Sequence, residues 1–173
     1  MSLLLGLDPG LQCTGYGCVR AEGRQFVLVE AGTFRSRADQ PLESRLAALH
    51  ADLCEVIAEC RPTAVAMEDL FTHVKHPRTA VVMGHARGVL MLAAAQAVLT
   101  ITPYPATRVK VALTGSGRAG KEQVARSVCH LLGLEEAPRP FDVTDALAVA
   151  ICHGLSEAAG TAASRYELRP PTA

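Results

Sequence analysis

The sequence has no tryptophan and few other aromatic residues, with only three tyrosines and four phenylalanines among 173 residues. Its six cysteines form no C-x-x-C pair and show no spacing typical of a zinc site. Most of them lie in apolar runs, so we expect reduced thiols in the core of a cytoplasmic protein. These absences argue against a secreted disulfide-rich protein and against a zinc-binding module.

The sequence also lacks a long uncharged apolar run. Its longest apolar stretch, residues 79–99, carries His85 and Arg87 near its middle, which favours a buried helix over a membrane span. The N-terminal apolar run is too short for a signal peptide, and no basic segment precedes it. A hydrophobic content of 49% excludes disorder. We therefore expect one soluble domain over residues 1–159, followed by a flexible tail over residues 160–173.

The formal net charge of zero hides an uneven distribution along the chain. Residues 70–126 carry eight Lys and Arg residues but one acid, Glu122, whereas the segments on either side are acidic. A neutral protein overall would argue against a nucleic-acid partner. Charge that is segregated in this way predicts instead a basic face that contacts phosphates, with the acids kept for another task.

The order of the predicted elements indicates the fold class. Apolar runs separated by glycines predict three strands in antiparallel hairpins. Helical periodicity and short buried runs then predict alternating helices and strands, ending in three helices. The expected strands are 3–8, 16–21, 26–34, 63–69 and 99–105, and the expected helices are 42–60, 78–99, 107–115, 120–134 and 142–158. This order predicts an α/β fold with a central mixed five-stranded sheet, three antiparallel strands and then parallel ones, flanked by helices on both faces.

Two of the predicted strands end in carboxylates. The first strand runs through "LLLGLDPG" into Asp8, and "AVAMED" ends in Glu68 and Asp69. Strand ends lie at the rim of a sheet, where α/β proteins build their sites. The last helix offers Asp142 and Asp145, whose spacing of three residues puts both carboxylates on one face. If the two strands are neighbours, we expect Asp8, Glu68, Asp142 and Asp145 to meet.

Four carboxylates in one cleft need a counter-charge, because like charges raise one another's pKa. A pair of Mg²⁺ or Mn²⁺ ions would supply it, and two such ions about 3.5–4 Å apart can clamp a phosphodiester for in-line attack. Each acid alone also has a simpler structural explanation, as a helix cap, a salt-bridge partner at the rim, or a turn residue. Only their joint placement predicts a two-metal centre.

Four motifs resemble the RuvC family of Holliday-junction resolvases: "LGLDPGLQCTGYG", "AMEDLF", "GHARGV" and "DVTDALAVAICH". The resemblance covers roughly residues 2–155, in the order and spacing of the family. It implies a ribonuclease-H-like fold and a homodimer that binds four-way junction DNA and cuts two opposed strands of like polarity, with divalent metal, during recombination and repair. It also implies a branch-migration motor complex of the RuvA and RuvB type as a partner.

The resemblance further implies roles for individual residues. The catalytic, metal-binding acids of the family fall on Asp8, Glu68, Asp142 and Asp145. Its aromatic residue beside the junction bases falls on Phe71, although a phenylalanine is more often buried in a core. Its basic residues fall on Lys110 and Lys121, and Lys121 could either stabilise charge on the phosphate or only bind DNA. Further DNA contacts are expected in a loop where the family varies, at Lys75, His76 and Arg78.

A second motif, "GSGRAGKE" from Gly115 to Glu122, fits the first seven positions of a phosphate-binding P-loop. The eighth position should be Ser or Thr and is Glu122. The preceding segment also reads as a helix, whereas a P-loop follows a strand. A basic turn that contacts DNA phosphates through Arg118 and Lys121 is the favoured interpretation.

Two other function classes stay open at this point. The first motif also resembles the phosphate loop of the sugar-kinase, actin and heat-shock ATPase superfamily, but those proteins need two such domains to enclose ATP. A degenerate nuclease fold that only binds branched DNA is the other alternative. The presence of all four acids argues against it.

Overall fold

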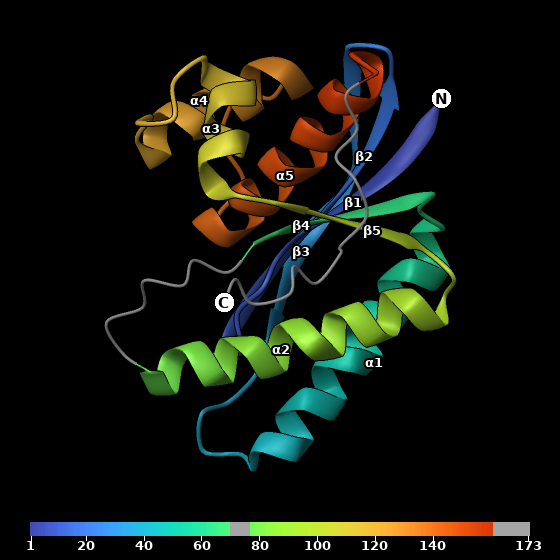
Figure 1. Cartoon of the computed structure of the whole chain (residues 1–173), viewed down its shortest axis with the longest axis vertical. Coiled ribbons are helices and arrows are strands. Elements are labelled where there is room, and N and C mark those ends of the chain that lie inside the picture. The colour runs from blue at the N-terminus through green and yellow to red at the C-terminus, as the bar shows by residue number, and fades with distance from the viewer. Residues whose placement is uncertain (70–76, 161–173) are drawn as a thin grey trace, which may run out of the picture.

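The computed structural model describes residues 1–69 and 77–160 (Figure 1). The strands are β1 (Ser2–Asp8), β2 (Cys13–Glu22), β3 (Gln25–Arg35), β4 (Ala64–Glu68) and β5 (Thr100–Tyr104). The helices are α1 (Leu42–Cys60), α2 (Pro77–Gln96), α3 (Ala106–Thr114), α4 (Lys121–Leu132) and α5 (Phe141–Ala158). The predicted order of strands and helices is confirmed.

The five strands form one sheet in the order β3-β2-β1-β4-β5. β1 pairs antiparallel with β2 and parallel with β4, and β5 is parallel to β4. The predicted mixed sheet is therefore confirmed, with β1 at its centre. Leu4, Leu5 and Leu7 are fully buried because helices cover both faces of this strand, which explains its continuous apolar run.

Helices cover both faces of the sheet (Figure 1). α1 and α2 pack on one face around Leu53 and Leu90, and α3, α4 and α5 pack on the other around Leu147 and Ile151. α5 lies between the sheet and the pair α3 and α4, so nearly all of its residues from Val143 to Gly154 are buried. This central helix carries the predicted acid pair at its N-terminal end.

Two glycines let α5 lie directly on the sheet. A Cβ atom at Gly6 would stand 2.0 Å from the main-chain oxygen of Ala146, and one at Gly15 would stand 1.9 Å from that of Asp142. Any side chain at these positions would push the helix away from β1 and β2. Close approach of the first turn of α5 to the end of β1 therefore depends on glycine in these two strands.

The structure differs from the predicted boundaries in one place that matters. The predicted helix over residues 78–99 ends at Gln96, and Val98 adopts a left-handed conformation with φ of 58° as the chain turns into β5.

The segment "GSGRAG" connects α3 to α4, so no strand precedes it and the P-loop interpretation fails. No helix within residues 1–69 and 77–160 is long and apolar enough to cross a membrane. The predicted flexible tail lies almost wholly outside the described residues.

Candidate active site

Asp8 and Glu68 lie side by side at the carboxyl ends of two paired parallel strands. The register of β1 and β4 places Leu7 opposite Met67, so the next residues, Asp8 and Glu68, are also opposite each other. The turn after Asp8 is closed by Thr14, whose buried hydroxyl accepts a hydrogen bond from the Gly10 amide at 3.2 Å. The predicted meeting of the two strand-end acids is confirmed.

The first turn of α5 brings Asp142 and Asp145 to the same end of the sheet. The residue that caps this helix is Pro140, and no side chain caps its N-terminus. The two aspartates are therefore not used as helix caps, the structural role that a first-turn acid most often has. The hydroxyl of Thr144 donates to the carbonyl of Pro138 at 2.7 Å and ties the start of the helix to the preceding loop.

The acids open onto a hollow with a basic rim. A pocket of about 230 Å³ is lined by Asp8, Glu68 and Asp145 together with Lys110 and Lys121. Asp8 and Glu68 also line a neighbouring pocket of about 390 Å³ on the side of α2. Asp142 borders a third pocket of about 520 Å³, between the β1–β2 turn and α2. The acids thus lie in a groove where an extended substrate has access to them.

The electrostatics of the groove favour a bound cation. Burial is the largest cause that raises the pKa of Asp8, and together with the nearby charges of Glu68, Asp145 and Asp142, and against the opposing charge of Lys121, it brings this pKa to about 8. Burial also raises the pKa of Glu68, with Asp145 adding to the effect and Lys121 and Lys110 opposing it. These carboxylates hold their negative charge at neutral pH more readily when an additional positive charge is near them.

Lys121 supplies part of that positive charge. Its Nζ lies 3.1 Å from Oδ2 of Asp145 and 5.7 Å from the centre of the Phe141 ring. The hydrogen bond to Asp145 raises the pKa of Lys121, so the ammonium group stays protonated. Lys121 is 67% exposed whereas Asp145 is 22% exposed, so the lysine reaches over the acid from the rim.

The four acids of the groove, Asp8, Glu68, Asp142 and Asp145, carry the oxygen ligands that divalent cations bind, although they do not stand in one close cluster. Carboxylate oxygens are the ligands that Mg²⁺ and Mn²⁺ prefer. Within residues 1–69 and 77–160, no three or more His, Cys, Asp and Glu side chains stand close enough together to hold a metal ion as they are. Asp145 is instead held in the ion pair with Lys121. A cation that uses Asp145 as a ligand must therefore compete with Lys121.

The other predicted DNA contacts have different positions. Lys110 lines the pocket with the acids, and Arg118 is exposed in the turn between α3 and α4. Phe71, Lys75 and His76 lie outside the described residues. Arg78 belongs to the first turn of α2, but its side chain lies outside the part that the structure describes.

Arg87 is a residue of this region that sequence reasoning did not assign. It is 5% exposed, one of its terminal nitrogens donates to the main-chain carbonyl of Glu68, and the other lies 3.2 Å from Oδ1 of Asp69. Asp69 directly follows Glu68 in the sequence, but its carboxylate pairs with Arg87. The sequence did contain an indication of this contact. Arg87 is a lone arginine in the apolar run of α2, and a buried charge needs a hydrogen-bonding or charged partner.

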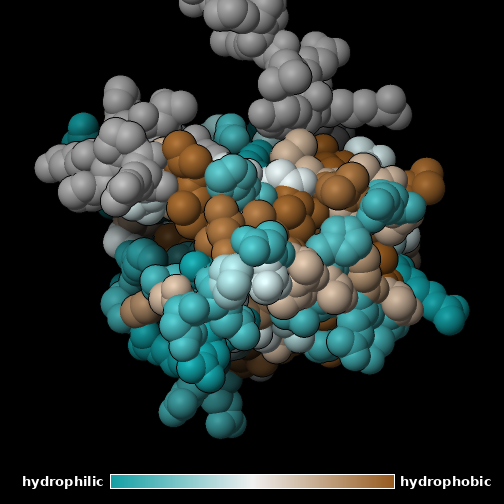
Figure 2. All heavy atoms as spheres, turned by 90° about the horizontal axis from the view of Figure 1, so that it is seen from below, coloured by the Kyte–Doolittle hydropathy of each residue, from teal (hydrophilic) through white to brown (hydrophobic). Residues whose placement is uncertain are grey.

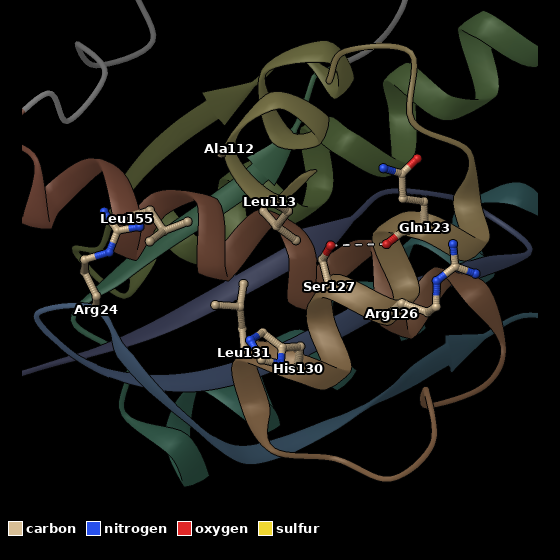
Figure 3. A pocket seen from close by; sticks show the side chains of 9 residues that line it. All are labelled: Arg24, Ala112, Leu113, Gln123, Arg126, Ser127, His130, Leu131 and Leu155. Atoms are coloured by element: carbon tan, nitrogen blue, oxygen red, sulfur yellow. Dashed lines mark hydrogen bonds between the residues drawn. The ribbon is translucent and has the colours of Figure 1, made fainter. Parts of the chain in front are cut away.

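A further pocket, of about 330 Å³, lies away from the acids between α3, α4 and the end of α5. Figure 3 shows that its basic side chains do not converge, because Arg24 and Arg126 lie at opposite ends with leucines between them. It contains no carboxylate. It therefore does not fit the chemistry of a cation-dependent site.

Comparisons with known proteins agree with this geometry. Residues 4–153 match the family model described as "Crossover junction endodeoxyribonuclease RuvC". A protein of that name from Pelotomaculum thermopropionicum is 49% identical over 151 residues, which cover 87% of this chain and 92% of the relative. One from Rhodopirellula baltica is 46% identical over 151 residues and covers 87% and 85%.

Solved structures of RuvC proteins also resemble this chain. The chain superposes on Thermus thermophilus RuvC in complex with a Holliday junction substrate with a TM-score of 0.89. The two sequences are 36% identical, and the superposition covers 94% of this chain and 98% of the other. The yeast mitochondrial Holliday junction resolvase Ydc2, at 12% identity and a TM-score of 0.67, shares the fold.

Proposed function

This chain belongs to the RuvC family of crossover junction endodeoxyribonucleases, and on this basis we propose that it binds four-way Holliday junctions and cuts two opposed strands of like polarity. The observation that carries the proposal is the meeting of strand-end and helix acids in one groove with lysines at its rim. The same observation, with the family membership, leaves no support for an ATPase of the actin and sugar-kinase type.

The four carboxylates are the proposed ligands of two divalent cations, Mg²⁺ or Mn²⁺. Asp8 lies between Glu68 on β4 and the acids of α5, so we assign it to both ions, with Glu68, Asp142 and Asp145 completing the set. When bound, such a pair of ions activates the attacking water and stabilises the departing 3′-oxygen. The role of the four side chains is to fix the ions against the scissile phosphate.

The lysines act on the DNA itself in this proposal. Lys121 lies beside Asp145 and can turn from that carboxylate to a phosphate oxygen once a cation takes its place. It would then offset the negative charge that develops on the phosphate. Lys110 on the same rim and Arg118 in the following turn would contact phosphates farther along the strand.

Replacing either lysine with alanine should weaken junction binding and reduce its dependence on salt. Each phosphate contact releases about one counterion, so Lys110→Ala and Lys121→Ala should each lower the slope of log affinity against log salt by about one. Fluorescence anisotropy with a labelled junction in EDTA measures this slope. Arg24→Ala, at the turn between β2 and β3, is the charge-matched control. An unchanged slope in both lysine variants would show that these side chains face away from the DNA.

We also propose that the protein acts as a homodimer, as the family resemblance implies, and that α2 forms part of the interface. Val81 and Leu92 on α2 are 58% and 52% exposed, and a Cβ atom at Gly84 or Gly88 between them would meet, within 4 Å, no atom of the described residues apart from its own neighbours and turn of the helix. Figure 2 shows apolar residues gathered in a band on the face that carries α1 and α2. A second copy would cover this band and bring two active sites to one junction.

A charge in this band should separate the two copies. Leu92→Glu would bury two unpaired carboxylates at the interface, at a cost of about 3 kcal/mol or more, which is about a hundredfold in the dissociation constant. Light scattering should give about twice the 18.3 kDa chain mass for the parent protein and the monomer mass for the variant. Val27→Glu, at an apolar position of similar exposure (54%) on the edge strand β3, should stay dimeric. A dimeric Leu92→Glu protein would exclude α2 from the interface.

The direct test of the proposed function uses synthetic DNA. Four-way junctions and linear duplexes of the same sequences are incubated with the protein, with and without Mg²⁺ or Mn²⁺. We expect paired nicks in the junction only, and only with metal. Junction binding in EDTA without any cleavage after metal is added would favour the non-catalytic binding module instead.

We place this activity in the cytoplasm, as a step of recombination and repair. A branch-migration motor of the RuvA and RuvB type remains the proposed protein partner. That proposal rests on the family resemblance alone.

A further inference from the structure

Arg87, a buried arginine of α2, contacts the end of strand β4. The side chain of Arg87 is 6% exposed, and its guanidinium reaches from α2 to the main-chain carbonyl of Glu68 and to Oδ1 of Asp69. A buried charge is costly unless its partners are well placed. The guanidinium of Arg87 lies at the end of β4, directly behind one of the acids of the groove.

The reason for this contact lies in the sequence of β1. The amide of Asp69 donates to the carbonyl of Tyr104 on β5 at 2.9 Å. Because successive residues of a strand direct their peptide groups to opposite sides, the carbonyl of Glu68 faces β1. Extending the register of β1 and β4 beyond Asp8 puts Pro9 where the donor to this carbonyl should be. Proline has no N–H group, so β1 leaves the Glu68 carbonyl without a partner.

We propose that Arg87 is a positioning residue for Glu68. It donates the hydrogen bond that Pro9 cannot, which fixes the peptide plane of Glu68 and so the direction in which its side chain leaves the strand. Its second contact holds Asp69 in an ion pair and keeps that acid out of the cluster. This inference deepens the proposed function, because it rests on Glu68 being a ligand of the catalytic cations.

The proposal predicts weaker metal binding when the contact is lost. Partners that orient a ligand typically change metal affinity or activity by about 10- to 100-fold, and we expect a loss in this range for Arg87→Met. Calorimetric titration of the DNA-free protein with Mn²⁺ measures the affinity directly. The metal concentration that gives half-maximal junction cleavage should rise by a similar factor, whereas junction binding in EDTA should stay unchanged. A residue that only supports the core would lower the melting temperature without these effects.

A second substitution can return the missing donor. Pro9→Ala supplies an amide N–H beside the Glu68 carbonyl, so the double variant Pro9→Ala/Arg87→Met should bind Mn²⁺ more tightly than Arg87→Met alone. The matched control is Arg45→Met. The Arg45 guanidinium also donates to a main-chain carbonyl, that of Leu11 at 3.5 Å, but it contacts no acid of the groove. Its removal should leave the affinity for Mn²⁺ unchanged.

The outcomes separate this inference from the proposed function. Parental Mn²⁺ affinity in a folded Arg87→Met protein would overturn the positioning role, and a double variant no better than Arg87→Met would overturn the link to Pro9. If Arg87→Met does not fold, Arg87→Lys decides, since a lysine can reach one of the two acceptors but not both. A parent protein that binds Mn²⁺ yet never cuts junctions would contradict the proposed function and leave the Arg87 experiment intact.

Discussion

Asp8→Asn should abolish junction cleavage and leave junction binding close to that of the parent protein. Asparagine keeps the size of the side chain but loses the charge that lies among Glu68, Asp142 and Asp145. We proposed Asp8 as a ligand of both catalytic ions, and loss of such a ligand should remove several kcal/mol of transition-state stabilisation, which is about a thousandfold or more in rate. Single-turnover cleavage in Mg²⁺ and anisotropy in EDTA measure the two quantities separately.

A matched substitution shows whether the loss is specific to the groove. Asp52→Asn makes the same chemical change on α1, a helix of the opposite face of the sheet, and should cut junctions at the parental rate. Cleavage by Asp8→Asn at a rate comparable with that of Asp52→Asn would remove Asp8 from the catalytic set. Loss of binding in Asp8→Asn would assign this residue to DNA contact rather than to catalysis.

The same residue should make the metal-free protein less stable as the pH rises. The pKa of Asp8 is about 8 in the folded protein and 3.8 in a free side chain, so between these values the folded state binds the proton and the unfolded state does not. The free energy of unfolding therefore falls as the pH rises from about 4 to about 8. Above the folded-state pKa the contribution of the protonated Asp8 to stability is lost completely. The expected fall from this one group is of the order of a few kcal/mol.

Thermal unfolding in EDTA across this pH range measures the effect, with Asp8→Asn as the reference. The variant should melt at a higher temperature than the parent at pH 8, and the difference should shrink toward pH 4. Contributions of groups that do not interact with Asp8, such as the lowered pKa of the buried His153, are common to both proteins and cancel. Saturating Mg²⁺ should stabilise the parent at pH 8 and not the variant. Equal melting temperatures at pH 8 would mean that burial and the neighbouring acids do not raise the pKa of Asp8 in the folded protein.

Much of the fold follows from local pattern. The continuous apolar run into Asp8 predicted a central strand buried on both faces, and the spacing of Asp142 and Asp145 predicted one shared helix face. The first is confirmed by the burial of β1. Both aspartates lie near the start of α5, but Asp145 lines the pocket of Asp8 and Glu68, whereas Asp142 borders the neighbouring pocket beside the β1–β2 turn. The meeting of Asp8 and Glu68 was expected only on the condition that their strands are neighbours, which no local signal indicates, and the parallel pairing of β1 with β4 meets that condition.

Other features could not be read from the sequence. The ion pair of Lys121 with Asp145 joins the start of one helix to the first turn of another, and no periodicity within either helix indicates it. The contact of Arg87 with the Glu68 carbonyl compensates for a proline on a different strand. Such relations are set by tertiary packing and appear only when the strand register is known. The predicted roles of Phe71 and Lys75 stay predictions.

The central claim is that acids from the ends of two strands and from the start of α5 hold divalent cations at one place. Crystals of the protein soaked in Mn²⁺ and measured at the manganese absorption edge locate these ions directly. We expect anomalous density bounded by Asp8, Glu68 and Asp145, with the Lys121 ammonium displaced from Asp145. Manganese bound elsewhere, with no ion among these three carboxylates, would contradict the account.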